Sequence, residues 1–283
     1  SKKNISAHYD IGNDLFKLFL DETMMYSSAY YADPDMTLHQ AAVAKLDLVC
    51  KKLDLQPQDH LLEIGTGWGG LAVHAATQYG CKVTTTTISD EQYRLALQKV
   101  SKYGLDDKIT VLKQDYRDLD GQYDKLVSIE MIEAIGHQYM NTYFEKCCSL
   151  LKPDGIMLIQ AITIKDQLYK SALKDVDFIK KYIFPGGFLP SIEAMSGAIA
   201  KYTDMKLYHL QDIGPHYART LKDWRDRFFD KLEEIRSLGY PDEFIRLWEY
   251  YFCYCEGGFM ERDIGTVQML LTRPENRREP VRL

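Results

Sequence analysis

The sequence predicts an α/β protein with a doubly wound, mostly parallel sheet, and three observations lead to this fold class. Short apolar runs alternate with helical patterns over residues 58–162, which is typical of parallel strands joined by helices. A glycine-rich turn at residues 65–70 follows the first run and precedes a helix, an arrangement that offers free backbone N–H groups to a ligand. The 283 residues are 46% hydrophobic, enough for one large domain with a substantial core.

The first half of the chain supplies most of the predicted sheet. An amphipathic segment over residues 8–31 includes a helix, and Thr37 is a typical N-cap for a helix over residues 38–53. The strands that follow are rich in Val, Ile, Leu and Thr, and helical patterns separate most of them. The expected strands are 61–64, 81–88, 109–112, 123–129 and 156–162, the expected helices are 71–79, 90–103 and 139–151, and a turn is expected at 153–155.

After residue 163 the alternation stops, and charged or aromatic helical patterns dominate. Glycines and prolines at 184–190 predict a rigid loop between them. We expect one domain over residues 1–283, with residues 164–260 forming a helical cap inserted after the fifth strand. The expected elements of this part are helices at 165–183, up to about 200, 220–238 and 241–257, with strands at 206–214 and 267–272.

Composition excludes several classes of protein. The net charge is −6, which argues against nucleic acid as a partner. No apolar run reaches the roughly 18–20 residues of a membrane-spanning helix, and we expect no signal peptide. The six cysteines lack C-x-x-C spacing, so reduced, mostly buried thiols are expected rather than disulfides. We therefore expect a cytoplasmic protein.

Two kinds of cofactor compete for the glycine-rich turn. A dinucleotide-binding turn has a third glycine and an acid at the end of the second strand, and both are missing here. Glu63 instead precedes the turn, which favours S-adenosylmethionine, whose ammonium and ribose need acceptors. The alternative is that Glu63 orients its own turn and Asp115 caps a loop. The candidate cofactor-binding residues are Tyr26, Ser27, Glu63, Gly65, Gly67, Thr87, Gln92, Asp115, Tyr116 and Ile129.

Several separate motifs, in a fixed order, give the chain a specific resemblance. They include Met-Met-Tyr-Ser-Ser-Ala-Tyr at 24–30 and Glu-Ile-Gly-Thr-Gly-Trp-Gly at 63–69. The others lie at 8–10, 128–133, 184–187 and 215–218. With them the chain resembles the cyclopropane-fatty-acyl-phospholipid synthases and mycolic acid cyclopropane synthases, from about residue 4 to about residue 272. The resemblance implies a seven-stranded, Rossmann-like methyltransferase sheet. Since larger members carry an extra N-terminal domain, we expect a short member or a fragment.

The resemblance also implies a reaction. The methyl group of S-adenosylmethionine goes to a cis double bond in an acyl chain, and loss of a proton from the added methyl closes a cyclopropane ring. An alkene is a poor nucleophile, so the site must align it with the sulfonium and exclude water. Carboxylates and aromatic faces can stabilise the cation, and a base must accept the proton.

In the family that this chain resembles, bicarbonate is that base, and the resemblance implies which residues hold it here. Glu133, the backbone of Ile162 and Tyr251 match the family pattern. Ser28 stands where the family has cysteine, and Gln160 where it has histidine. Both can still donate hydrogen bonds to an anion, although the thiol and the ionisable ring are gone. Bicarbonate is therefore an expected second cofactor.

The sequence leaves other reaction outcomes open. The same cation can lose its proton elsewhere and give a methyl- or methylene-branched chain. The chain is also similar to plant alkaloid N-methyltransferases, which use a Glu and a His. His137 follows Glu133 by four residues and could share a helical face with it, so His137 is a further catalytic candidate. An inactive member that senses S-adenosylmethionine or lipid is the remaining alternative.

The resemblance further implies a phospholipid substrate, and hence peripheral contact with the inner face of the membrane. Residues 1–57 would cover the cofactor, and aromatic residues of the cap would line an acyl pocket. A homodimer is compatible with the sequence. Lysines that could meet anionic headgroups are Lys2, Lys3, Lys165, Lys170, Lys174, Lys180 and Lys181. Candidate pocket residues are Phe178, Tyr182, Phe184, Phe188, Phe228, Phe229 and Phe252.

Overall fold

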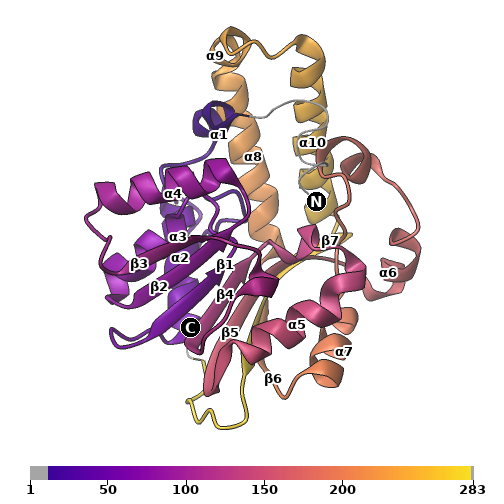
Figure 1. Cartoon of the computed structure of the whole chain (residues 1–283). Helices are drawn as coiled ribbons and strands as arrows, with labels where there is room; N and C mark the ends of the chain where they lie inside the picture. The colour runs from indigo at the N-terminus through magenta and orange to yellow at the C-terminus, as the bar shows by residue number, and fades with distance from the viewer. Residues whose placement is uncertain (1–11, 282–283) are drawn as a thin grey trace.

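A seven-stranded sheet forms the centre of the molecule (Figure 1), and the computed structural model describes residues 12–281. The strand order is β3-β2-β1-β4-β5-β7-β6. The pairs among β1 to β5 are parallel, whereas β7 runs antiparallel to both β5 and β6. The strands are β1 His60–Ile64, β2 Lys82–Thr87, β3 Ile109–Lys113, β4 Tyr123–Ile129, β5 Leu151–Ile164, β6 Lys206–Asp212 and β7 Ile264–Thr272. The predicted fold class is confirmed. The predictions for residues 8–10, Lys2 and Lys3 lie outside the described residues.

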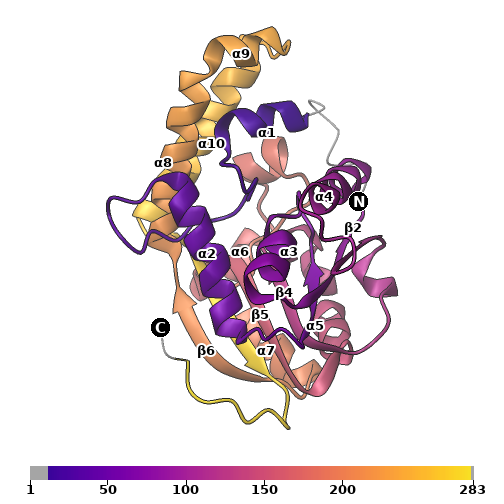
Figure 2. The same cartoon turned by 90° about the vertical axis from the view of Figure 1, so that its left-hand side faces the viewer.

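Helices cover both faces of the sheet because its central strands are apolar on both sides. Leu61 packs with α2, α3 and α4, whereas the next residue, Leu62, packs with α5 and α7. Figure 2 shows α2 and α3 in front of the strands, on the first of these faces. The helices are α2 Leu38–Leu53, α3 Gly70–His74, α4 Asp90–Lys102, α5 Met140–Ser149 and α7 Ile192–Tyr202, and a π-helical turn, Ala75–Tyr79, continues α3.

The N-cap prediction for the second helix is confirmed. Thr37 accepts a hydrogen bond from the backbone N–H of Gln40, whose side chain in turn accepts one from the N–H of Thr37. This reciprocal capping satisfies two N–H groups that the helix itself leaves free. It fixes where α2 begins, and therefore which of its residues face the sheet.

The turn predicted at 153–155 is instead part of a strand. β5 pairs with β4 at Leu151 and again from Ile156, and the register shifts between these two points. Gly155 and its neighbours thus form an irregularity within β5 rather than a connection before it. Local turn signals do not distinguish a bulge from a loop, because both need the same backbone freedom.

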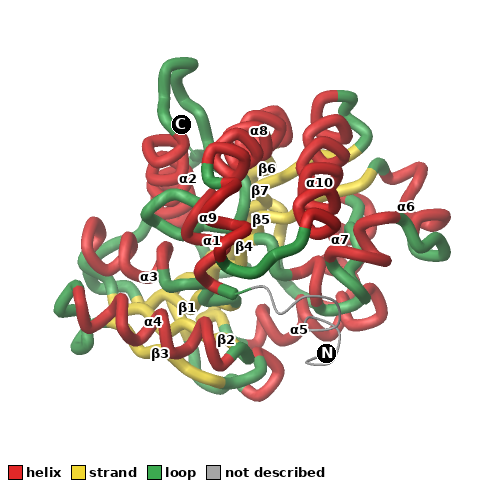
Figure 3. The backbone as a smooth tube through the Cα atoms, turned by 90° about the horizontal axis from the view of Figure 1, so that it is seen from above, coloured by secondary structure: helices red, strands yellow, loops and turns green. Residues whose placement is uncertain are grey.

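The cap rises above one end of the sheet as a helical hairpin (Figure 1). Viewed from above, α8, α9 and α10 lie over the strand ends together with α1 (Figure 3). Aromatic side chains hold them together: Phe228 stacks on Trp248, and Phe19 of α1 packs against both. The helices are α1 Asn13–Phe19, α8 Gly214–Asp230, α9 Leu232–Ser237 and α10 Asp242–Met260.

Two predicted cap helices have the wrong bounds. The one expected at 220–238 begins at Gly214, with Pro215 in its first turn, and is interrupted at Lys231. The one expected at 165–183 is α6, Asp166–Ala172, followed by a separate π-helical turn, Ile179–Ile183. The Asp177 side chain accepts from the N–H of Lys180, so this residue starts a new turn instead of continuing the old helix.

Two expectations from the composition concern free cysteines and the absence of a membrane-spanning helix. All six cysteines lie in the described part of the chain and are free, four of them buried. Within residues 12–281, none of the helices combines the length and the apolar character needed to cross a bilayer. Phe228 and Phe252 are wholly buried in the aromatic cluster, so these two candidate pocket residues belong to the core.

Candidate active site

The carboxyl ends of the parallel strands meet at one edge of the sheet, where doubly wound folds bind ligands. The glycine-rich turn after β1 lies at this edge, and Gly65 and Gly67 have φ values of 100° and 52°. These angles favour glycine, because a side chain there strains the backbone. Above Gly67 a Cβ atom would meet nothing within 4 Å. The turn thus leaves open space beside its backbone, which fits an adenosine-type cofactor.

Glu63 lies in β1, two residues before that turn, and is only 3% exposed. Thr85 of the neighbouring strand donates a 2.6 Å hydrogen bond to its Oε2. Burial raises the pKa of Glu63 to about 8, and Thr85 and Lys45 oppose this shift. The side chain is therefore anchored to β2 rather than to its own turn. Its other oxygen has no hydrogen bond within the described residues and suits a ribose hydroxyl.

The segment before α2 crosses the same edge and carries Tyr26 and Ser27. The hydroxyl of Ser27 accepts a 2.9 Å hydrogen bond from Lys45 Nζ. Lys45 is fully buried, and burial lowers its pKa to about 8. The negative charges of Glu130, Asp21 and Glu63 act in the opposite direction, so Lys45 lies among the acids of the site. Sequence analysis missed this lysine.

The remaining cofactor candidates lie at the ends of β2, β3 and β4. Thr87 donates to Gln92 Oε1 at 2.9 Å, which ties the end of β2 to the start of α4. Ile129 is the last residue of β4. Asp115 accepts two hydrogen bonds from the guanidinium of Arg117. These hydrogen bonds are the main reason why the pKa of Asp115 is lowered. The ring of its neighbour Tyr116 packs against Tyr143. A role for these residues in cofactor binding stays a prediction.

Glu133 lies just beyond β4, in the short 3-10 turn Ile132–Ala134. Its Oε1 accepts a 2.6 Å hydrogen bond from the N–H of Ile162, a residue of β5. Its Oε2 is buried and has no hydrogen-bond partner among the described residues. Burial, together with the charge of Glu130, raises the pKa of Glu133 to about 8. An unpaired, buried acid of this kind is typical of a catalytic site.

Glu130 is the most connected acid of the site, although sequence analysis did not single it out. Its Oε1 accepts from the backbone N–H of Ser28 at 3.0 Å and from the amide of Gln160 at 2.8 Å. Its Oε2 accepts from the hydroxyl of Tyr217 at 2.7 Å. Burial raises the pKa of Glu130, and these three donors oppose that rise. The motif at 128–133 contains Glu130, but only the fold shows where it points.

Ser28 and Gln160 are both fully buried and both contact Glu130, but in different ways. Ser28 uses its backbone N–H, while its hydroxyl donates to the carbonyl of Ala29. Gln160 uses its side-chain amide, and its carbonyl oxygen accepts from Gln268 on the neighbouring strand β7. The Ser28 hydroxyl therefore donates to Ala29, and only the backbone N–H of Ser28 donates to Glu130. A role for Ser28 in holding an anion stays a prediction.

Tyr251 lies on α10 and is buried, and within the described part of the chain it makes no hydrogen bond to Glu130 or Glu133. Its hydroxyl is hydrogen-bonded to that of Tyr26 at 3.0 Å. Tyr217 of α8 is the tyrosine that reaches Glu130. The motif at 215–218 includes it, so the signal was present in the sequence. The structure thus brings Tyr217 to Glu130 and places Tyr251 beside Tyr26. A role for Tyr251 in holding an anion stays a prediction.

His137 does not pair with Glu133. The two residues lie in separate 3-10 turns, with Gly136 at a φ of 88° between them. His137 is exposed, and its ring lies 6.2 Å from that of Phe188. The prediction of a shared helical face is wrong, because that spacing brings residues together only on a continuous helix.

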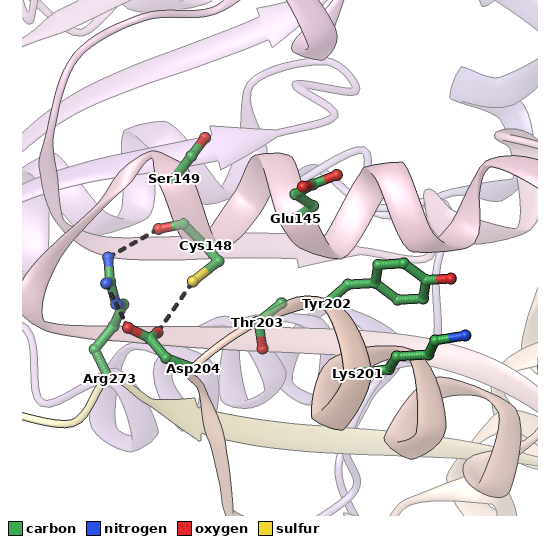
Figure 4. Close-up of a pocket in the computed structure, with 8 residues that line it drawn as sticks. All are labelled: Glu145, Cys148, Ser149, Lys201, Tyr202, Thr203, Asp204 and Arg273. Atoms are coloured by element: carbon green, nitrogen blue, oxygen red, sulfur yellow. Dashed lines mark hydrogen bonds and ion pairs between the residues drawn. The ribbon is translucent and has the colours of Figure 1, made fainter.

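A surface hollow of about 510 Å³ lies between α5 and α7, away from these acids. Figure 4 shows Cys148, Asp204 and Arg273 at one end of it, joined by hydrogen bonds. Arg273 and Asp204 form an ion pair with each other there. The hollow therefore contributes no chemistry to the site at the strand ends.

Comparison with known proteins agrees with this geometry. The family described as mycolic acid cyclopropane synthetase matches residues 1–269. A tuberculostearic acid methyltransferase of Mycobacterium tuberculosis is 40% identical over 96% of this chain, and a cyclopropane-fatty-acyl-phospholipid synthase of Escherichia coli is 41% identical over 94%. The chain spans 65% and 66% of the length of these two relatives.

A solved structure resembles the chain over nearly its whole length. It is a mycolic acid cyclopropane synthase complexed with SAH and CTAB, with a TM-score of 0.88 and 32% identity. The alignment covers 95% of this chain and 97% of that one. The order of the motifs, the sheet and these matches agree. The chain belongs to the mycolic acid cyclopropane synthetase family.

Proposed function

We propose that the chain transfers the methyl group of S-adenosylmethionine to a cis double bond in an acyl chain of a phospholipid and closes a cyclopropane ring. One observation carries the proposal: two largely buried carboxylates, Glu130 and Glu133, lie just past β4, next to the strand that carries Glu63 and the glycine-rich turn. A cation formed from an alkene needs such charge nearby, and it forms beside the cofactor.

The cofactor assignment rests on the residues of this chain. The open space at Gly67 and the free oxygen of Glu63 fit a ribose and its attached chain. When bound, S-adenosylmethionine supplies an electrophilic methyl group. The related structure holds SAH, the compound that remains after methyl transfer. Glu63 orients the cofactor, while the segment with Tyr26 and Ser27 covers it.

Aromatic side chains surround the expected position of the acyl chain. The ring of Tyr26 lies 5.3 Å from that of Trp224 and 6.4 Å from that of Phe184. Phe184 is in turn 6.1 Å from Tyr251. Their faces stabilise a nearby cation, and their bulk excludes the water that would trap it. Phe184 is 45% exposed, so it lies where an acyl chain can enter.

A methyl- or methylene-branched product is the second candidate, because the same cation gives it if the proton leaves from another carbon. The 40% identity to a tuberculostearic acid methyltransferase supports keeping it. The small-molecule N-methyltransferase alternative is less well supported, because a Glu and a His act together in those enzymes and His137 lies in a separate turn from Glu133 here. It is not proposed further.

The test combines labelled S-adenosylmethionine with vesicles of an unsaturated phospholipid. We expect label in the extracted acyl chains, and mass spectrometry after hydrogenolysis distinguishes a ring from a branch. Glu133→Gln should lower turnover by about 100-fold or more, because it removes the charge beside the cation, and cofactor affinity should stay unchanged. Glu145→Gln, an exposed acid on α5, is the matched control. Near-normal turnover in Glu133→Gln, or no label in lipid with any variant, contradicts the proposal.

A further inference from the structure

The donors expected to hold bicarbonate are already occupied in this chain. Ser28 and Gln160 donate to Glu130, and the N–H of Ile162 donates to Glu133. These are three of the five positions at which the resemblance implies a bound anion. A free bicarbonate would therefore have to displace a side chain that belongs to the protein. The residues present do not fit that ion.

Glu130 is held in this position from several sides. Tyr217 binds its second oxygen, so three donors from three separate segments converge on one carboxylate. Its backbone N–H donates to the carbonyl of Gln160 at 2.8 Å. Its φ is 47°, a left-handed conformation that costs a non-glycine residue energy and persists only where the surroundings enforce it. Such strain is commonly found at functional sites.

A buried row of amides fixes which atom of Gln160 faces Glu130. Gln160 and Gln268 are paired across β5 and β7, and Gln268 donates to Gln160 Oε1 at 2.9 Å. Lys52 of α2 donates to Gln268 Oε1 at 2.8 Å. An ammonium has donors only, so it sets the orientation of Gln268, which then sets that of Gln160. Gln160 thus presents its N–H groups to Glu130, which favours the ionised carboxylate.

We propose that the carboxylate of Glu130 takes the place of bicarbonate and itself accepts the proton released on ring closure, so that the reaction needs no bicarbonate. This inference rests on the proposed function. In the step, a C–H bond of the added methyl breaks and its electron pair forms the second ring bond to the cationic carbon. The proton goes to Glu130. Glu130 retains partial exposure, so it returns the proton to solvent after the product leaves.

Binding of bicarbonate gives a test that needs no turnover. Glu130→Gly removes the carboxylate at a backbone angle that glycine adopts without strain, while Glu130→Gln keeps the volume and loses the charge. Isotopically labelled bicarbonate is titrated against each protein and followed by NMR line broadening. We expect saturable binding to Glu130→Gly and none to the wild type or Glu130→Gln. Saturable binding to the wild type, or none to a Glu130→Gly sample with a wild-type circular dichroism spectrum, overturns the proposal.

Turnover then tests the chemical role. In buffer free of carbon dioxide, the wild type should work as fast as in millimolar bicarbonate. Glu130→Gly should be about 100-fold slower without bicarbonate, because it lacks the base, and should recover at least about tenfold when bicarbonate is added. Glu130→Gln should be slow in both buffers. A wild type that stops without bicarbonate contradicts the proposal while supporting the methyl-transfer function, and the binding experiment remains decisive if no lipid turns over at all.

Discussion

At the scale of single residues, burial rather than residue type sets the chemistry of this site. Glu63 and Glu133 are both acids whose pKa burial raises to about 8, and Lys45 is a base whose pKa burial lowers to about 8. In each case burial shifts the pKa in the direction that favours the uncharged form of the side chain. Groups of this kind can change charge near physiological pH, which suits the handling of a cationic cofactor and a proton.

Glu63 makes the stability of the protein without cofactor depend on pH. Its folded pKa of about 8 exceeds the ordinary 4.5, so the folded state holds a proton that the unfolded state has released between these values. The stabilisation is full below the unfolded pKa and is lost as pH rises through the folded one. Thermal unfolding followed by circular dichroism should show Tm falling over this window, and less steeply in Glu63→Gln. Parallel Tm profiles for the two proteins would contradict the assignment.

The signal for the buried lysines was present in the sequence. Lys45 and Lys52 are seven residues apart on the apolar stripe of a predicted helix, so the helical periodicity predicts that both face the core. Their hydrogen-bond partners, Ser27 and Gln268, could not be predicted, because these residues come from other segments of the chain. Sequence periodicity predicts the direction of a side chain but not its partner.

At the scale of elements, the start of α3 shows how closely the covering segment lies on the glycine-rich turn. A Cβ atom on Gly70 would be 2.6 Å from the carbonyl oxygen of Thr23 and 3.0 Å from the sulfur of Met25. The nearer atom belongs to the backbone and cannot move aside alone. The segment that carries Tyr26 and Ser27 is therefore positioned by the absence of a side chain at Gly70.

Gly70→Ala should destabilise the fold by about 1–3 kcal/mol, because the added methyl overpacks this contact. It should also weaken binding of S-adenosylmethionine, since the segment with Tyr26 and Ser27 must shift. Gly257→Ala is the matched control, because a Cβ there meets nothing within 4 Å and the residue lies inside α10. Calorimetric titration and urea unfolding measure the two effects. Wild-type affinity and stability in Gly70→Ala would show that the segment adapts freely.

Elements with strong local signals were predicted well, and those set by tertiary contacts were not. The N-cap residue Thr37 predicted where α2 begins, and the apolar run that ends at Ile129 predicted the bounds of β4. The irregularity of β5 around Gly155 and the break in α8 at Lys231 depend on how strands and helices meet their neighbours. Propensity is a weak guide where packing decides.

At the scale of the whole molecule, one surface combines exposed apolar residues with lysines. Val176 is 72% exposed and is flanked in the sequence by Asp175 and Asp177, with the exposed Lys174 and Lys181 close by. Phe178 packs on Tyr250 of α10 at 4.5 Å. This surface adjoins Phe184, where we propose that an acyl chain enters. An exposed apolar side chain with lysines nearby suits contact with a membrane surface, and we predict such contact here.

Val176→Asp should weaken binding to vesicles of anionic phospholipid by about tenfold, because it removes a contact of ~1.5 kcal/mol and adds a repelled charge. Leu97→Asp is the control, because Leu97 is also an exposed aliphatic residue but belongs to α4, on the other side of the molecule (Figure 1). This variant should leave vesicle binding unchanged. Co-sedimentation with the vesicles measures both. Equal losses in the two variants would mean that this surface has no special role.

By itself, the sequence determined the fold class, the strand that ends in the glycine-rich turn, and the position of Glu133 just past β4. These follow from periodicity and turn chemistry, which act over a few residues. Only the tertiary structure decided the partners: Glu130 with Ser28, Gln160 and Tyr217, and His137 away from Glu133. A hydrogen bond such as that from Ser28 to Glu130, 102 positions apart, depends on how distant segments of the chain are brought together, and no local sequence pattern predicts it.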